Sequence, residues 1–253
     1  MKLSFVIPAY NEEDLIGQCL DSILKQTAGR PDDIEIIVVN NASTDRTRAV
    51  ASSFPGVIVV DEPQKGIVHA RRAGFLASSS DLIANIDADT MLTPGWIDKV
   101  LKEFSENQNL VALSGPYIYY DLSKSHNFLI RVYYYIGYLS YIVNHFVLHM
   151  GAMLQGGNFI LKRSALEKIG GFDTNIIFYG EDTDIARRIQ KVGRVKFTFK
   201  LPMYTSGRRL KKEGILTMAL RYPINYIWVT IFKRPFTKTY LDVRFKEDEK
   251  KPV

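Results

Sequence analysis

Short apolar runs alternate with segments of helical periodicity through the first 110 residues, and this alternation limits the fold more than any other feature. Apolar runs of strand length occupy residues 3–8, 35–40, 57–61 and 81–87. Between these runs apolar residues recur three and four positions apart, as they do over residues 15–24. Strands that are apolar on both faces and are separated by single helices favour a parallel sheet covered by helices on both sides. The sequence therefore predicts an α/β fold.

Past residue 110 the pattern becomes less regular. A further strand is expected within residues 110–122, a helix from Glu181, and a short strand over 194–199. Two long apolar stretches, 128–149 and 214–232, also lie in this half. The one cysteine of the chain rules out a disulfide framework or a cysteine-based metal site.

Polar residues stand where three of the predicted strands end. They are Pro8 to Glu12, Asn40 to Asp45, and the pair Asp87 and Asp89. Ligands of α/β sheets bind beyond the carboxyl ends of the strands, so these residues predict a binding site.

Asp87 and Asp89 indicate a bound cation. If the strand that ends at Ile86 continues, residues two apart point the same way and their carboxylates crowd together. That arrangement is unfavourable unless a cation lies nearby. Capping of the helix near Pro94 explains the pair less well, because both aspartates lie too far upstream.

Seven segments, in order, resemble the family 2 inverting glycosyltransferases of the GT-A fold. They are FVIPAYNEEDLIGQCLDSIL, EIIVVNNASTD, KGIVHARRAGF, the DAD triplet, GGNFILKR, GGFD and GED. The resemblance implies a GT-A domain over residues 1–209, with a nucleotide-sugar half (1–110) and an acceptor half (111–209). Residues 210–253 are expected to form C-terminal amphipathic helices and a polar tail.

The resemblance also implies roles for the residues at the strand ends. Asp89 would hold Mg²⁺ or Mn²⁺, hard cations that prefer oxygen ligands, and Asp87 would lie nearer the ribose. The donor would be a nucleotide diphosphate sugar, with a UDP-sugar as the default. The other expected donor-binding residues are Pro8, Ala9, Tyr10, Glu12, Asn40, Lys65, Arg71, Arg208 and Arg209. Arg208 and Arg209 stand near the place of the family's Gln-x-x-Arg-Trp segment, which is absent here, and could clamp a diphosphate.

Asn40 departs from the family, whose members usually carry aspartate there. An asparagine accepts a hydrogen bond through its oxygen but also donates through its nitrogen. Uracil therefore stays the expected base, and guanine, which prefers a partner that only accepts, is disfavoured.

Asp182 and Glu181 resemble the acceptor-side acidic pair of the family. Inverting transfer is a single displacement in which a base removes the proton of the attacking hydroxyl, and Asp182 is the expected base. Acids at the start of a helix also occur for dipole reasons alone. The acceptor would be a lipid-linked molecule or a saccharide, as in the synthesis of a cell-envelope glycan.

The charge distribution predicts contact with an anionic membrane surface. Residues 187–253 hold 18 Lys and Arg against 5 Asp and Glu, whereas the remainder holds 15 against 22. Helices within 128–149 and 214–232 would lie in the interface, with Lys233, Arg234 and Lys238 at the headgroups. An oligomer interface or the protein core is the alternative for both stretches. The first apolar run is too short for a signal peptide, which places the expected enzyme on the cytoplasmic face of the membrane.

Two other functions are alternatives to a glycosyltransferase. A nucleotidyltransferase would carry a Gly-rich, Arg-bearing loop after the first strand, and PAYNEED has no such composition. A degenerate sugar-nucleotide sensor remains the alternative, because Asn40 and the absent tryptophan depart from the family. No nucleic-acid partner is expected.

Overall fold

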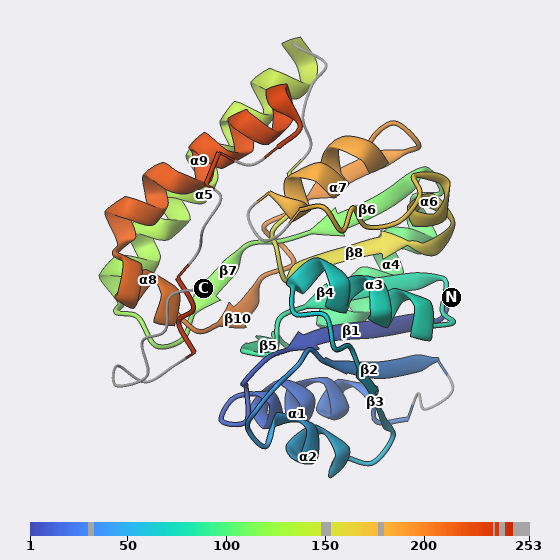
Figure 1. Cartoon of the computed structure of the whole chain (residues 1–253). Helices are drawn as coiled ribbons and strands as arrows, with labels where there is room; N and C mark the ends of the chain where they lie inside the picture. The colour runs from blue at the N-terminus through green and yellow to red at the C-terminus, as the bar shows by residue number, and fades with distance from the viewer. Residues whose placement is uncertain (30–32, 148–152, 177–179, 235, 238–240, 245–253) are drawn as a thin grey trace.

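The computed structural model describes residues 1–29, 33–147, 153–176, 180–234, 236–237 and 241–244 (Figure 1). A seven-stranded sheet has the order β3-β2-β1-β4-β8-β6-β9, and only β8 runs antiparallel to its neighbours. Its strands are β1 Leu3–Ala9, β2 Ile34–Asn40, β3 Val57–Asp61, β4 Leu82–Ile86, β6 Leu110–Ser114, β8 Asn158–Lys162 and β9 Arg194–Phe197. The predicted α/β fold with a mostly parallel sheet is confirmed.

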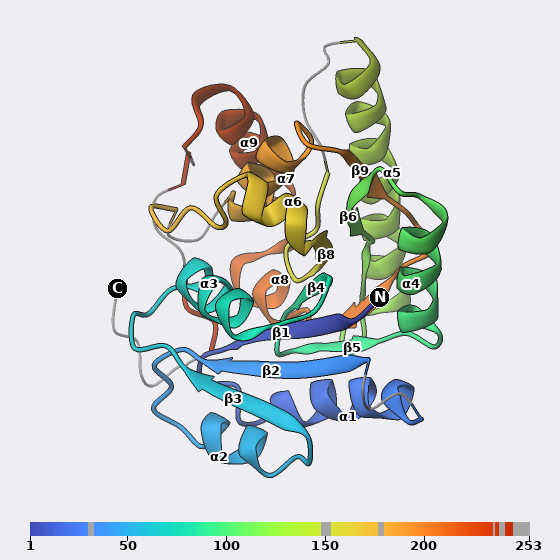
Figure 2. The ribbon, with the colours of Figure 1, turned by 90° about the vertical axis from the view of Figure 1, so that its right-hand side faces the viewer.

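Helices cover both faces of this sheet, as Figure 2 shows for α1 and α2 on one side and α3 on the other. The helices are α1 Ile16–Thr27, α2 Thr47–Ser52, α3 Ile67–Ala77, α4 Trp96–Glu106, α5 Lys124–Val147, α6 Arg163–Lys168, α7 Glu181–Ile189, α8 Arg208–Glu213 and α9 Ile215–Phe232. A hydrophobic core lies on each face of the sheet, and alternate residues of β1 pack into one or the other. Phe5 packs with α1 and α4, and Val6 packs with α3.

The parallel register brings the carboxyl ends of β1, β2 and β4 to one edge. Ala9 pairs with Asn40, and Leu3 pairs with both Ile34 and Leu82. Strands from beyond residue 110 belong to the same sheet, so the predicted halves 1–110 and 111–209 share one sheet. The boundary at residue 110 stays a prediction.

Two details of the strands differ from what the sequence suggests. β4 ends at Ile86, and Asp87 and Asp89 lie in a turn that the Thr90 N–H closes by donating to the Asp87 carbonyl at 3.1 Å. The two carboxylates therefore need not point the same way. The strand expected within 110–122 divides into β6 and β7 Tyr117–Tyr119, and β7 joins a second sheet with β5 Thr90–Leu92 and β10 Met203–Thr205.

The helices α5 and α9 both carry exposed apolar side chains. The Tyr133 hydroxyl donates to the Ala219 carbonyl at 3.4 Å. Leu129, Ile136 and Leu139 of α5 are about 60% exposed. Leu216 and Leu220 of α9 are 82% and 68% exposed. The length and composition of α9 are sufficient for it to cross a membrane, but core helices of soluble proteins can also meet these two criteria. Only 17% of α9 is buried, so the core alternative does not fit this helix.

Glu35 on β2 joins β1 to the loop before β4. Its carboxylate accepts hydrogen bonds from the hydroxyls of Ser4, Ser79 and Ser80, and from the Ser79 N–H at 2.9 Å. Partial burial acts to raise the pKa of Glu35, but these hydrogen bonds outweigh it and lower the pKa to about 2.

Glu35→Gln is expected to lower the free energy of unfolding by about 1–2 kcal/mol at neutral pH, because an amide nitrogen would face hydrogen-bond donors. The folded-state pKa lies below the usual value of 4.5, so the wild-type advantage is complete above that pH. It fades as the pH falls from 4.5 toward about 2. Urea unfolding at pH 7 and pH 3 measures the difference. The exposed Glu106 provides the control variant Glu106→Gln, and an advantage of equal size at both pH values would contradict the account.

Candidate active site at the carboxyl edge of the sheet

The loops after β1 and β2 are tied to each other. The Asn11 N–H donates to the Ser43 hydroxyl at 3.2 Å, and the Thr44 N–H donates to Asn11 Oδ1 at 2.8 Å. The Glu12 N–H donates to the Thr47 hydroxyl at 2.7 Å. These bonds fix the loop that carries Tyr10 and Glu12 next to the end of β2, where Pro8 and Ala9 of β1 lie beside Val39 and Asn40.

Asp87 is held by two groups from different parts of the chain. Arg71 of α3 lies 3.3 Å from Asp87 Oδ1, and the Tyr117 hydroxyl donates to Oδ2 at 3.3 Å. Arg71 is fully buried and also pairs with Glu181. Burial acts to lower the pKa of Arg71, but Glu181 and Asp87 raise it above its usual value. The structure thus places Arg71 against carboxylates.

Asp89 lies on the other side of the turn and faces Arg208. The Arg208 guanidinium is 3.0 Å from Asp89 Oδ2 and also pairs with Glu12. Burial and the negative charges of Glu12 and Asp87 raise the pKa of Asp89 to about 7, although Arg208 opposes the rise. The positive charge that the sequence predicts beside these two aspartates is supplied in part by Arg71 and Arg208.

The carboxylates of Asp87 and Asp89 fit a divalent cation of the Mg²⁺ or Mn²⁺ type. The donor set consists only of oxygen, and the side chain of Asp87 is 34% exposed, so one face can be reached. Within the described ranges no group of three or more His, Cys, Asp or Glu side chains is placed to hold a metal ion. Mg²⁺ commonly binds through one or two carboxylates and completes its shell with phosphate and water, which suits this pair.

Asp182 stands at the start of α7, close to the same site. Its Oδ2 accepts from the Gly156 N–H at 3.1 Å, and its Oδ1 accepts from the Thr183 N–H at 2.7 Å. Burial raises the pKa of Asp182. The Gly156 carbonyl accepts from the Tyr117 hydroxyl at 2.6 Å, so one glycine connects Asp182 to the group that holds Asp87.

Glu181 has a different environment from Asp182. Burial raises its pKa to about 7, and its pairing with Arg71 opposes the rise. A carboxylate tied to a buried arginine is poorly placed to contact an acceptor. The acidic pair therefore separates into Asp182, which is half-buried, and Glu181, which orients Arg71.

Asn40 donates from its side-chain nitrogen to Asp61 Oδ1 at 2.8 Å. This bond is the largest cause of the lowered pKa of Asp61. The Asn40 oxygen is buried and accepts no hydrogen bond from the residues that the structure describes. One N–H of the amide is thus in use, and its oxygen is left for another group.

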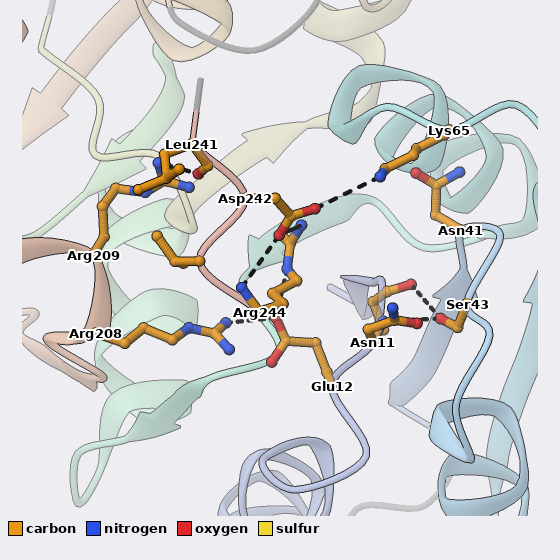
Figure 3. Close-up of polar contacts among 12 residues, drawn as sticks. Asn11, Glu12, Asn41, Ser43, Lys65, Arg208, Arg209, Leu241, Asp242 and Arg244 are labelled. Atoms are coloured by element: carbon orange, nitrogen blue, oxygen red, sulfur yellow. Dashed lines mark hydrogen bonds and ion pairs between the residues drawn. The ribbon is translucent and has the colours of Figure 1, made fainter. Parts of the chain in front are cut away.

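The two adjacent arginines expected to clamp a diphosphate divide between two locations (Figure 3). Arg208 contacts Glu12 and Asp89, whereas Arg209 contacts Glu213 at 2.7 Å and the Leu241 carbonyl at 3.3 Å. The structure does not bring Arg209 to the aspartate pair. Lys65 does reach the site, where its ammonium lies 4.0 Å from the centre of the Tyr10 ring.

Three further residues of this edge are not indicated as site residues by the sequence. Tyr117 contacts Asp87, and Arg244 pairs with Glu12 at 3.0 Å. Gly157 has φ +77°, and a Cβ there would collide with Asp87 and Tyr117. The Gly156-Gly157 doublet was a visible signal within GGNFILKR, but nothing in the sequence around Tyr117 or Arg244 indicates a role.

Solved structures with this architecture include a mannosyltransferase and a glucosyl-3-phosphoglycerate synthase. A mannosyltransferase from Pyrobaculum calidifontis in complex with GDP-Man and Mn²⁺ has a TM-score of 0.66, with 22% identity, over 92% of this chain and 63% of its own. Glucosyl-3-phosphoglycerate synthase from Mycobacterium tuberculosis, in complex with Mn²⁺, UDP and phosphoglyceric acid, has a TM-score of 0.61 at 20% identity over 95% and 81%. These matches confirm the GT-A fold.

Curated relatives are similar over parts of their length. Probable glycosyltransferase YdaM of Bacillus subtilis is 27% identical over 213 residues, which are 76% of this chain and 47% of the relative. Chondroitin synthase of Pasteurella multocida is 33% identical over 115 residues, which are 44% of this chain and 12% of the relative. The chain therefore spans less than half the length of either protein.

Two family profiles match the sequence. The N-terminal domain of galactosyltransferase matches residues 143–210. Glycosyl transferase family 2 matches residues 4–170, which include β1 to β8 and the aspartate pair. Because that match covers well over half of the 253 residues, the chain belongs to glycosyl transferase family 2.

Proposed function

We propose that this protein is a metal-dependent, inverting glycosyltransferase that moves a sugar from a nucleotide diphosphate sugar to a hydroxyl of a lipid-linked or saccharide acceptor. The observation that carries the proposal is the placement of Asp87 and Asp89, on a family 2 fold, between Arg71 and Arg208 at the carboxyl edge of the sheet. Solved structures of the same fold in complex with Mn²⁺ and a nucleotide or nucleotide sugar support the choice of ligand.

Asp89 would be the direct metal ligand, and Asp87 would lie toward the ribose. A divalent cation bound there would neutralise the charge that builds on the leaving diphosphate. Arg208 would exchange its contact with Asp89 for a phosphate oxygen, since a guanidinium matches both anions in geometry. Arg71 would hold Asp87 in place from a fully buried position.

Asp182 would act as the base. A proton removed from the acceptor hydroxyl would go to this carboxylate as the oxygen attacks the anomeric carbon and the bond to the diphosphate breaks. Burial raises the pKa of Asp182, which makes it a stronger base than an exposed aspartate. Glu181 would assist only by fixing Arg71.

Asn40 would bind the base of the nucleotide through its oxygen. Asp61 accepts one of the two amide N–H groups, and the oxygen has no hydrogen bond from the residues that the structure describes, so an acceptor is available to the base. This arrangement supports a base with a ring N–H and weakens the sequence-based argument against guanine. A uridine diphosphate sugar remains the first donor to test, and a guanosine diphosphate sugar the second.

A donor screen tests the proposal. Thermal unfolding would be followed with uridine, guanosine, adenosine and cytidine diphosphates, each with Mn²⁺ and with a chelator. We expect one uracil- or guanine-containing nucleotide to raise the unfolding temperature in Mn²⁺ only, because a ligand that binds the folded state stabilises it. A protein that responds to none of the four, or equally to all four without metal, would contradict the proposal.

The exposed faces of α5 and α9 support binding to the surface of a membrane. Their apolar side chains are accompanied by the basic excess of residues 187–253, a combination typical of helices that lie in the interface. We place the enzyme on the cytoplasmic face of the membrane on this basis, as a peripheral protein of cell-envelope glycan synthesis. Lys233 and Arg234 follow α9 directly, while Lys238 lies outside the described residues. A dimer through the same face is the competing arrangement.

Leu220→Ser is expected to weaken sedimentation with anionic vesicles by about three- to tenfold, because a side chain that is 68% exposed would leave the apolar interface. High salt should release the wild-type protein, since the headgroup contacts are electrostatic. Leu76→Ser is the matched control, because Leu76 is 64% exposed and belongs to α3, not to α5 or α9. Equal sedimentation with neutral and anionic vesicles, or a dimer that Leu220→Ser dissociates, would favour the other arrangement.

A further inference from the structure

Four residues near the C-terminus, Leu241–Arg244, lie across the edge of the sheet where the nucleotide is proposed to bind (Figure 3). We call them the strap. More than 170 residues of sequence separate the strap from the loops that it covers. Figure 3 shows Asp242 between Lys65 and Arg244, and its carboxylate lies 3.6 Å and 3.7 Å from their nitrogens.

The strap contacts three groups that the nucleotide would need. Arg244 donates to Glu12 Oε1 at 3.0 Å, and its guanidinium lies 5.4 Å from the centre of the Tyr10 ring. The Lys65 ammonium, which pairs with Asp242, lies over the same ring. An aromatic face, a carboxylate and an ammonium at one edge of the sheet are thus all in contact with the chain's own side chains.

The strap is anchored to α8 by its backbone. Lys212 donates to the Val243 carbonyl at 2.9 Å, and Arg209 donates to the Leu241 carbonyl at 3.3 Å. Val243 is 7% exposed, and the side chain of Asp242 is 6% exposed. Asp242 therefore places a buried negative charge among cations, as a bound anion would.

We propose that the strap is an internal ligand of the donor site, which a nucleotide diphosphate must displace before it can bind. This inference rests on the proposed function, because it takes Tyr10, Glu12 and Lys65 as donor-binding groups. A lid that closes over a bound nucleotide would leave these three groups directed at the ligand. Here they are engaged by Asp242 and Arg244 instead, so strap and nucleotide compete.

Only molecules in which the strap has moved off the donor site can bind nucleotide. The apparent affinity for nucleotide is therefore the intrinsic affinity multiplied by the fraction of such molecules. By linkage, nucleotide must in turn loosen the strap. Val243 allows both effects to be tested without a change of charge, since its side chain is buried and apolar and its backbone bond to Lys212 does not depend on the side chain. Leu241, which is 50% exposed in the same segment, offers a matched control.

The experiment uses the full chain as wild type, Val243→Ser and Leu241→Ser. Calorimetry measures the affinity for uridine and guanosine diphosphate in Mn²⁺, and hydrogen exchange measures protection of the Leu241–Arg244 amides with and without nucleotide. We expect Val243→Ser to bind nucleotide about three- to tenfold more tightly, because the closed fraction falls, and Leu241→Ser to match wild type. Nucleotide should speed exchange of the strap amides in the wild-type protein.

Weaker nucleotide binding by Val243→Ser, or slower exchange of the strap when nucleotide is added, would overturn the proposal and make the strap a lid. Unchanged affinity in Val243→Ser together with unchanged exchange on nucleotide addition would also overturn it. If neither wild type nor Val243→Ser binds any nucleoside diphosphate, the proposed function itself fails, and the strap proposal fails with it. All the other results still show nucleotide binding and leave the proposed function standing, so failure of the strap proposal can be told apart from failure of the proposed function.

Discussion

Asp89→Ala is expected to abolish the metal-dependent part of nucleotide diphosphate binding. Outer-shell partners of a metal site commonly contribute about 10- to 100-fold in affinity, and a direct ligand should contribute at least the upper value. Glu12 keeps Arg208 in place when Asp89 is removed, because the guanidinium contacts both carboxylates. The loss should therefore appear in Mn²⁺-dependent affinity and not in folding. Calorimetry with nucleotide, in Mn²⁺ and in chelator, measures it.

Asp21→Ala is the control for this variant, because Asp21 is an exposed carboxylate on α1. It should bind nucleotide and Mn²⁺ as wild type does. Mn²⁺-dependent affinity that survives in Asp89→Ala would remove Asp89 from the metal site and leave Asp87 as the candidate ligand.

Asp182→Asn is expected to lower turnover by about 10²- to 10⁴-fold, the usual contribution of a positioned base. An amide cannot take the proton of the acceptor hydroxyl, so the chemical step loses its base. Donor affinity should change little, because Asp182 contacts Gly156 and Thr183 and no residue of the nucleotide edge is among its hydrogen-bond partners in the described structure. Release of nucleoside diphosphate and donor affinity are measured on the same preparation.

Both carboxylate oxygens of Asp182 accept a hydrogen bond from a backbone N–H. In Asp182→Asn, the side-chain nitrogen must therefore face one of these two N–H groups. The free energy of unfolding should fall by about 1–2 kcal/mol as a result, and turnover must be measured well below the unfolding temperature. Asp173→Asn, at an exposed position, serves as the control. Turnover that stays near wild type would mean that Asp182 only starts α7. Loss of donor affinity together with turnover would place Asp182 at the diphosphate.

The order of strands and helices in the first half could be predicted because local pattern determines it. Apolar runs become β1 to β4, helical spacing becomes α1 to α4, and parallel pairing then brings Asn40 and Glu12 to one edge. This part of the site could be predicted from position along the chain, since all the loops that follow strands of a parallel sheet lie at the same edge of it.

Contacts between distant segments could not be predicted in the same way. The Tyr117 contact with Asp87 depends on the break between β6 and β7. Gly115-Pro116 is typical of such a turn, but nothing in the sequence shows which residues the chain meets beyond it. Arg208 and Arg209 are neighbours in sequence, but successive residues of a helix point in different directions, which separates them. The contact of Arg244 with Glu12 requires the chain after α9 to return to β1, and its polar composition gave no sign of that path.

The anomeric configuration of the product tests the account most directly. With the donor identified by the nucleotide screen, the wild-type protein would be given Mn²⁺ and saccharide or lipid-linked acceptors, and nuclear magnetic resonance would follow the new glycosidic bond. The account predicts release of nucleoside diphosphate in Mn²⁺ but not in chelator, and a bond of configuration opposite to that of the donor. Retained configuration, or equal release in chelator, would contradict it, and donor binding with no release for any acceptor would favour a sugar-nucleotide sensor.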